Sequence, residues 1–274
     1  MPDGRMVLHA GCGYRVRMDE SSGSSERHRN AGAGRLGGLD ERRVVVIGGG
    51  SGIGLAIARA GLDAGAHVVL AGRSMRRLEA ALASLDAGDR ARALPCDVAR
   101  EADVAALFER SGPIDHVVVT AADLAYQPIS TFDIAAARRA TDSKLLGALL
   151  VAKHAGPRLP QHGSITFTSG VASERPLARG SMVAAVNGAL ASFVRAAAIE
   201  LAPVRVNALS PGWVDTELWE AIGDKEAKFA AMAERLPARR IGRPEELAHA
   251  AVFLMENTFT TGAVLAVDGG HRFA

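Results

Sequence analysis

The chain has few residues that form covalent or metal cross-links, and this scarcity excludes several classes of protein. Only two cysteines, Cys12 and Cys96, occur in 274 residues, so neither a disulfide framework nor a cysteine-based metal cluster is expected. The eight histidines show no paired spacing of the HExxH type, and we expect no metal site. This cysteine usage fits a reducing compartment.

The chain also lacks a strong excess of charge and a long continuous apolar segment. Its formal net charge is +2, and arginines stand beside acids, as Arg76 and Arg77 stand near Glu79. This pattern is typical of solvated helix faces rather than of a nucleic-acid surface. Neither a secretory signal nor a membrane span is visible, so we expect a cytoplasmic protein that binds neither nucleic acid nor membrane.

Residues 1–40 differ in composition from the rest of the chain. Glycine, serine and arginine dominate there, and residues 21–25 read Ser-Ser-Gly-Ser-Ser, which is typical of a linker. We therefore expect a disordered tail over residues 1–40. One domain is expected over residues 41–274.

The most informative segment runs from Val44 to Gly54, where a β-branched run leads into a glycine-rich turn and then into an apolar helical pattern. Glycines permit a tight turn and let backbone N–H groups approach a diphosphate at the start of the following helix. A glycine run also serves plain turns, but the strand before it and the helix after it favour a dinucleotide site. The predicted cofactor contacts here are Gly48, Ser51, Gly52, Ile53 and Gly54.

Strand and helix patterns alternate along the rest of the chain, and the strands are apolar on both faces. This alternation predicts an α/β fold with a doubly wound parallel sheet, the Rossmann fold. After the first strand we expect strands at 67–71, 91–94, 116–120, 164–167, 204–208 and 264–267. Helices are expected from residue 55, and at 75–85, 102–109, 132–153, 181–201 and 244–255.

A helical stretch at about 213–240 interrupts the alternation. It carries Trp213, Trp219 and Phe229 in a chain with only 4% aromatic residues. Because it follows a strand at the edge where open α/β sheets bind ligands, we interpret it as a small substrate lid. The alternative is a surface insertion that packs its aromatic rings on the body of the domain.

The residues after the second and third strands bear on the adenosine end of the cofactor. Arg73 stands where an arginine accepts a 2′-phosphate, and no acid is beside it, which favours NADP(H) over NAD(H). Alternatively, Arg73 stacks on the adenine or faces water, and Ser51 adds no second basic group. Asp97 follows the third strand, where its carboxylate either accepts from the adenine amino group or caps the next helix.

These segments together resemble the short-chain dehydrogenase/reductase superfamily over residues 43–270. The resemblance is carried by Gly48 to Gly54, Cys96-Asp97-Val98, Arg205 to Gly212, Gly242 to Glu246, Thr261-Gly262 and Val267 to Gly270. It implies that Val98, Ala121, Pro211, Gly212, Val214 and Thr216 also lie along the cofactor. It further implies hydride transfer at a carbonyl carbon and a homodimer or homotetramer formed through two long helices.

The proton-transfer motif of this family, Tyr-x-x-x-Lys with a serine thirteen residues upstream, is absent. The two tyrosines are Tyr14 and Tyr126, and the residues four positions later are Met18 and Ser130. Alignment on the helix at 181–201 places Val183 at the tyrosine position, Asn187 at the lysine position and Gly170 at the serine position. Lys144 stands where the family has an asparagine, and Thr120-Ala121-Ala122 replaces Asn-Ala-Gly.

Three residues are the candidates for the missing chemistry. Lys144 brings a positive charge that would polarise a carbonyl oxygen, unless it pairs with Asp142 or reaches water. Ser169 is a candidate donor, unless it closes a backbone hydrogen bond. Asn187 shares a helix face with Val183, where its amide would hold a ribose hydroxyl.

Other proton sources are Thr168, Tyr126, a bound water and a hydroxyl of the substrate itself. The sequence thus predicts an NADP(H)-dependent ketoreductase with a non-standard proton donor, acting on an apolar, cyclic or aromatic small molecule. The alternative is a catalytically silent protein that senses NADP(H) or serves as a partner subunit. A decarboxylase, dehydratase or isomerase that uses the same pocket is a third reading.

Overall fold

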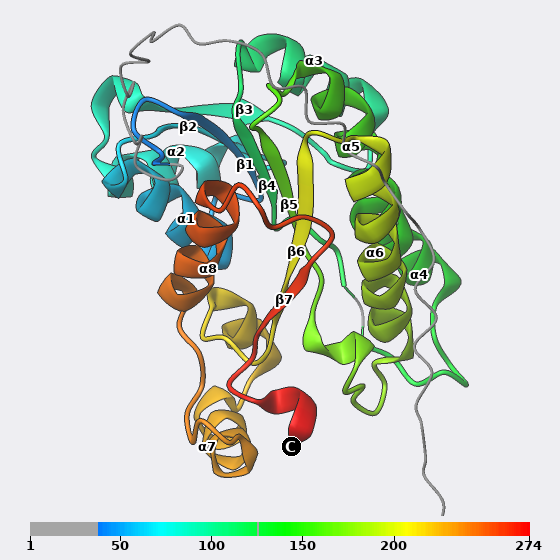
Figure 1. Ribbon diagram of the computed structural model, residues 1–274. Coiled ribbons are helices and arrows are strands. Elements are labelled where there is room, and N and C mark those ends of the chain that lie inside the picture. Colours follow the sequence, from blue (N-terminus) through cyan, green and yellow to red (C-terminus); the bar gives the residue numbers. More distant parts are fainter. Residues whose placement is uncertain (1–37, 125) are drawn as a thin grey trace, which may run out of the picture. The chain divides into compact units, whose positions relative to one another are not determined.

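A computed structural model describes residues 38–124 and 126–274. Seven parallel strands form one sheet in the order β3-β2-β1-β4-β5-β6-β7 (Figure 1). Because the order runs outward from β1 in both directions, the sheet is doubly wound, as the alternation of the sequence predicted. The strands are β1 (Arg43–Ile47), β2 (His67–Gly72), β3 (Ala91–Pro95), β4 (His116–Val119), β5 (Ser164–Thr168), β6 (Arg205–Pro211) and β7 (Val264–Val267).

Helices cover both faces of the sheet. They are α1 (Gly52–Asp63), α2 (Met75–Leu85), α3 (Glu101–Ser111), α4 (Ile134–Thr141), α5 (Gly147–Ala155), α6 (Ser181–Glu200), α7 (Lys225–Arg235) and α8 (Pro244–Glu256). Alternate residues of a strand point to opposite faces, so Val44 and Val46 pack in the core cluster that also holds buried residues of α1, α2 and α8. Val45 and Ile47 pack in the cluster with α3, α5 and α6. These two clusters therefore cover the two faces of the sheet.

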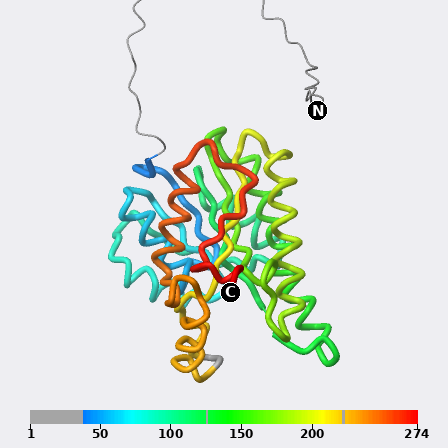
Figure 2. Tube along the Cα trace, turned by 60° about the horizontal axis from the view of Figure 1, so that its bottom comes forward, coloured from blue at the N-terminus to red at the C-terminus, as the bar shows by residue number. Residues whose placement is uncertain are grey.

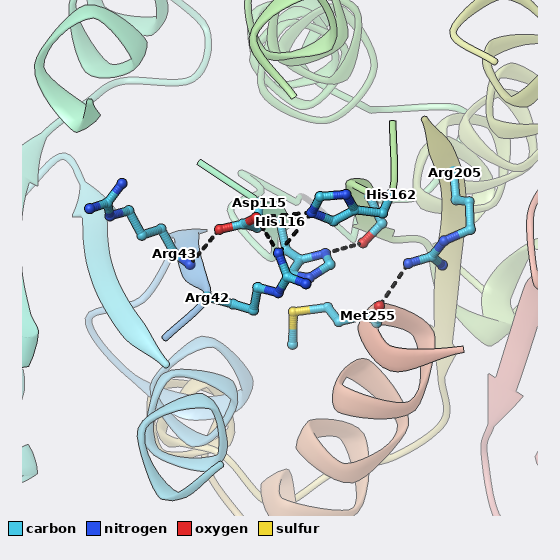
Figure 3. Close-up of polar contacts among 8 residues, drawn as sticks. Arg42, Arg43, Asp115, His116, His162, Arg205 and Met255 are labelled. Atoms are coloured by element: carbon cyan, nitrogen blue, oxygen red, sulfur yellow. Dashed lines mark hydrogen bonds and ion pairs between the residues drawn. The ribbon is translucent and has the colours of Figure 1, made fainter. Parts of the chain in front are cut away.

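A polar network ties the strands together at the edge where they begin (Figure 3). The Asp115 carboxylate accepts from Arg42 Nη1 at 3.1 Å and from the backbone N–H of Arg43 at 2.9 Å, and His162 lies 3.3 Å from it. Beside it, His116 Nδ1 is 2.9 Å from Ser164 Oγ. These contacts join the starts of β1, β4 and β5, so the opposite edge, where the strands end, is left for a ligand.

Arg205 extends this support to the last helix. Its guanidinium donates to the backbone oxygen of Leu254 at 2.6 Å. It also donates to that of Met255 at 2.7 Å (Figure 3). These oxygens belong to the last turn of α8, where carbonyl groups have no partner within the helix. The first residue of β6 therefore caps α8 and anchors it to the sheet.

The structure changes several of the expected boundaries. Leu39, which the sequence assigned to the tail, is only 1% exposed and packs in the core under α1. The single helix expected at 132–153 begins at Ile134, after Asp133 caps it, and is interrupted by a π-helical turn, Asp142–Leu146. A π-turn inserts one extra residue into the helical ladder, and the helix continues after it as α5.

Helix α6 is long and apolar enough to cross a membrane, judged by length and composition alone. Its buried residues, which include Leu190, Val194 and Ala197, pack against the sheet in the core shared with α3 and α5. The position of α6 in the core therefore accounts for its length and apolar composition, as is common for the central helix of an α/β domain.

The stretch interpreted as a lid contains the 3₁₀ helix Glu217–Ile222 and α7. In Figure 2, the orange segment that contains α7 projects from the end of the domain where the strands end. Trp213 and Trp219 stack on each other with ring centroids 4.3 Å apart, and Phe229 contacts both edge-on. The rings thus hold the insertion together by packing on one another.

Candidate active site

The turn after β1 is packed so closely that only glycine fits at its key positions. Gly48 has φ +93°, and a Cβ there would lie 2.4 Å from Thr120 Oγ1 and 2.7 Å from the backbone nitrogen of Ala121. A Cβ at Gly54 would lie 2.1 Å from the carbonyl oxygen of Gly48. The turn therefore presents backbone rather than side chains to whatever binds there.

Helix α1 starts in this turn without a side-chain cap. Ser51 occupies the N-cap position with an extended backbone, its hydroxyl accepts no capping hydrogen bond, and the first turn of the helix holds no acidic residue. By contrast, Ser74 caps α2 and Asp133 caps α4. The first N–H groups of α1 thus have no partner of their own, which makes this helix start fit the diphosphate of a dinucleotide.

A cleft of about 700 Å³ runs along the ends of the strands from this turn. Ten of the predicted cofactor residues line it: Gly48, Ser51, Gly52, Ile53, Gly54, Arg73, Asp97, Val98, Ala121 and Thr216. Four others, Asn187, Pro211, Gly212 and Val214, are not among its lining residues. The close packing behind the cleft involves Gly212, since a Cβ there would lie 2.7 Å from the Asp268 Cα.

A groove of about 740 Å³ lies on the other side of α1, between α1 and α8. It shares Gly52, Thr216 and Glu217 with the cleft, but Gly48, Ser51 and Arg73 line only the cleft. Since these residues have the geometry that suits a phosphate, the cleft rather than the groove is the candidate cofactor site.

Charged residues gather at the end of the cleft next to β2. Arg73 lies there, and Arg77, which the sequence reading took for part of a solvated helix face, also lines the cleft. The Cβ of Arg77 would be 3.5 Å from a Cβ at Gly50, so this arginine stands directly beside the glycine turn. Arg77 is the third residue of α2, four positions after Arg73, and this nearness in sequence was the available signal.

The residues after β3 serve local structure as well as the cleft. Asp97 lines the cleft, and its Oδ1 also accepts from the backbone N–H of Ala99 at 3.1 Å. Burial, with smaller contributions from Asp103 and Asp97, raises the pKa of the Cys96 thiol to about 12. A thiol with so high a pKa stays protonated and is a poor nucleophile or metal ligand. In the part of the chain that the structure describes, no cluster of three or more His, Cys, Asp or Glu side chains suits a metal ion.

The three predicted catalytic residues come together, but behind the cleft rather than in its lining. Lys144 lies in the π-turn, is 6% exposed, and its Nζ donates to the backbone oxygen of Ser169 at 3.0 Å. Ser169 Oγ donates to the backbone oxygen of Asn187 at 3.1 Å. Burial lowers the pKa of the Lys144 ammonium to about 8. Lys144 therefore donates to a backbone oxygen rather than pairing with Asp142, and Ser169 closes a backbone hydrogen bond.

Asn187 and Gly170 are fitted to each other. Asn187 Nδ2 lies 3.4 Å from the backbone oxygen of Gly170, and a Cβ at Gly170 would be 2.8 Å from the same nitrogen. The amide thus occupies the space that a side chain at position 170 would need. Its Oδ1 is buried without a hydrogen-bond partner, an arrangement that costs stability unless a ligand or water supplies a donor.

Thr168 is the candidate proton source that does line the cleft. It is the last residue of β5, and its Oγ1 is buried without a hydrogen-bond partner among the described residues. Tyr126 is 45% exposed in the segment after β4 and is not among the residues that line the cleft. Of these two candidate proton sources, Thr168 is therefore the one that lies beside the cleft.

The lid contributes Thr216, Glu217 and Leu218 to the cleft. None of the rings of Trp213, Trp219 and Phe229 is among the lining residues, because they stack on one another. The Nε1 of Trp219 donates to the backbone oxygen of Val214 at 2.9 Å, which fixes this cluster to the end of β6.

Comparison with known proteins agrees with this geometry. A family model described as Enoyl-(Acyl carrier protein) reductase matches residues 48–272. The chain is 39% identical over 243 residues to the cis-4-hydroxycyclohexanecarboxylate dehydrogenase of Sinomonas cyclohexanicum, covering 84% of this chain and 96% of that protein.

Two solved structures also match. The MalC reductase/Diels-Alderase of Malbranchea aurantiaca is 30% identical with a TM-score of 0.81, and the match covers 86% of this chain and 98% of that one. A small-chain dehydrogenase in complex with NADPH is 32% identical with a TM-score of 0.71, covering 86% of this chain and 100% of that one. With its sheet order and glycine turn, the chain belongs to the short-chain dehydrogenase/reductase superfamily of NAD(P)-dependent oxidoreductases.

Proposed function

We propose that this protein is an NADP(H)-dependent ketoreductase that acts on an apolar, cyclic small molecule. The observation that carries the proposal is the uncapped start of α1 in a glycine turn flanked by Arg73 and Arg77. The diphosphate would lie on the N–H groups of this turn, and the two guanidinium groups would bind a 2′-phosphate. When bound, NADPH would supply the hydride.

The chain's own part in the reaction is to hold the carbonyl oxygen. We assign the contact with that oxygen to Thr168, because this residue lines the cleft and its buried hydroxyl has no hydrogen-bond partner among the described residues. Lys144 does not line the cleft. Its Nζ donates to the backbone oxygen of Ser169, the residue that follows Thr168 in the chain. Its positive charge would stabilise negative charge that develops on the oxygen, and the proton would come from solvent or from a hydroxyl of the substrate.

The class of substrate is supported by the relatives. One acts, by its name, on a hydroxylated cyclohexane ring, and another is named a reductase and a Diels-Alderase. The substrate panel therefore contains 4-oxocyclohexanecarboxylate, unsubstituted cyclic ketones and quinones. Titration of NADPH and NADH by fluorescence measures binding, and loss of the reduced-nicotinamide absorbance measures turnover.

Replacement of the Thr168 hydroxyl tests the mechanism. We expect Thr168→Val to lower kcat by about 10- to 100-fold while NADPH binding is retained, because a hydrogen bond to developing charge is lost. The matched control is Thr166→Val, which removes an equally unpartnered hydroxyl two residues earlier on β5 at a fully buried position outside the cleft. Equal losses in both variants would contradict the role of Thr168.

A silent nucleotide-binding protein is the second candidate, and one observation favours it. The side chains of Lys144, Ser169 and Asn187 are buried in hydrogen bonds to backbone oxygens and do not line the cleft. Tight NADPH binding without turnover on any member of the panel would support this second function over the first.

We further propose a homodimer or homotetramer. Apolar side chains on the outer surfaces of α5 and α6 support this, since Leu149 is 42% and Ile199 is 80% exposed. Light scattering coupled to gel filtration measures the oligomeric state, and a monomer at micromolar concentration would refute the proposal.

A further inference from the structure

Three charged side chains from three separate elements meet at the mouth of the cleft. The Asp123 carboxylate lies 4.0 Å from Arg73 Nη1 and 4.0 Å from Arg139 Nε. Arg73 follows β2, Asp123 follows β4, and Arg139 belongs to α4. A single carboxylate therefore lies between two guanidinium groups.

The sheet order places this contact over the cofactor site. β1 lies between β2 and β4, so an ion pair from Arg73 to Asp123 crosses the end of β1 above the glycine turn. The adenosine ribose of a dinucleotide lies at this place in the fold, and an arginine after β2 is the group that accepts a 2′-phosphate there. Asp123 thus holds the guanidinium that the phosphate requires.

We propose that Asp123 sets the dinucleotide preference of the site by competing with the 2′-phosphate of NADP(H) for Arg73. The inference rests on the proposed function, since it requires a dinucleotide in the cleft. The side chains of Arg73 and Asp123 are 66% and 41% exposed, so their ion pair is weak and a phosphate displaces it. The displaced carboxylate stays tethered near the phosphate and repels it.

Arg139 moderates this repulsion. Because its Nε lies 4.0 Å from the same Asp123 oxygen that Arg73 approaches, it offers the displaced carboxylate a second cation. NADH has no 2′-phosphate, so its binding requires no exchange of partners at Arg73. Asp123 therefore weakens the binding of NADPH without changing that of NADH.

The test is a pair of fluorescence titrations on Asp123→Asn and on the wild type. We expect the Kd for NADPH to fall by roughly three- to tenfold in the variant, and the Kd for NADH to stay within about twofold. The gain should shrink as salt is raised, because screening weakens the repulsion. Asp123 donates its backbone N–H to Ser143 Oγ at 2.9 Å, a contact that asparagine retains, so the fold is expected to survive.

Two further variants sharpen the test. Asp89→Asn is the matched control, because it removes the same charge from an exposed turn before β3, outside the cleft, and should change neither Kd. Arg139→Gln should weaken NADPH binding by roughly twofold or more, because the carboxylate then has only Arg73 as a partner.

The outcomes separate this inference from the proposed function. If the wild type binds neither dinucleotide, the proposed function fails. If the wild type binds NADPH but Asp123→Asn leaves its Kd unchanged, or shifts both Kd values equally, the role of Asp123 is refuted while the proposed function stands. A loss of NADH affinity alone would also refute it, because Asp123 would then bind the ribose hydroxyls.

Discussion

Replacement of the buried Lys144 should make the stability of this protein depend on pH in a defined window. Burial lowers the pKa of this ammonium from 10.5 to about 8 in the folded protein. The unfolded chain therefore binds the proton more readily, and the free energy of unfolding of the wild type rises as pH increases from 8 to 10.5. At about 1.4 kcal/mol for each pH unit, and with only partial titration at the two ends of this window, the rise amounts to about 3 kcal/mol.

Lys144→Met removes the charge and keeps most of the length of the side chain. The variant also loses the hydrogen bond to the backbone oxygen of Ser169, and an unpaired buried carbonyl costs about 1–3 kcal/mol at every pH. At pH 7 we therefore expect Lys144→Met to be as stable as the wild type or up to about 2 kcal/mol more stable. At pH 10.5 it should be about 1–3 kcal/mol less stable, because only the lost hydrogen bond remains.

The assay is urea unfolding followed by circular dichroism at several pH values between 7 and 10.5. Titrations elsewhere in the chain are common to both proteins and cancel in the difference between their unfolding free energies. Lys153→Met serves as the control, because it removes an equal charge from a side chain that is 64% exposed. If the unfolding free energies of Lys144→Met and the wild type changed with pH in parallel, the reasoning would be refuted. Lys144 would then have the same pKa in the folded and unfolded states.

Two further predictions concern acid stability and the glycine turn. Burial lowers the pKa of His116 to about 3, so the unfolded chain gains a proton below pH 6.5 that the folded protein does not, and stability falls as pH drops through that window. At pH 4 the wild type should therefore have lost about 3 kcal/mol more than His116→Asn, measured by urea unfolding, and equal losses would contradict this. Gly54→Ala should abolish NADPH binding, measured by fluorescence, because its Cβ would lie 2.1 Å from the Gly48 oxygen, whereas Gly188→Ala, with nothing within 4 Å, should retain it.

The fold was predictable because its signals are local. The β-branched run at Val44 and the alternation of strands and helices gave the sheet, and the helix at 75–85 and the strand at 264–267 have the predicted bounds. The boundaries that differ depend on contacts distant in sequence. Strand β6 continues to Pro211 because its last residues pair with β7. Leu39 is buried because it packs in the core cluster that also holds residues of α1.

The same distinction applies to the site. The glycine turn and Arg73 lie within one βαβ unit, so their spacing alone predicted where they would lie. The pairing of Arg73 with Asp123 joins residues fifty positions apart, and that of Lys144 with Ser169 joins residues 25 positions apart. The periodicity of a sequence does not indicate such contacts. The sequence therefore offered only Asp142 or water as structural partners of Lys144, and it did not single out Asp123.

The departures from the family's catalytic motif are coupled in three dimensions. Glycine at position 170 leaves the space that the Asn187 amide fills, and Val183, one helical turn before Asn187, is 1% exposed. A serine restored at 170 would have to displace that amide from the Gly170 oxygen, and a tyrosine at 183 would have to leave a closed core. The substitutions therefore form one packing arrangement rather than independent losses. This arrangement is why a proton route is better sought at Thr168, on the cleft, than by restoring single residues behind it.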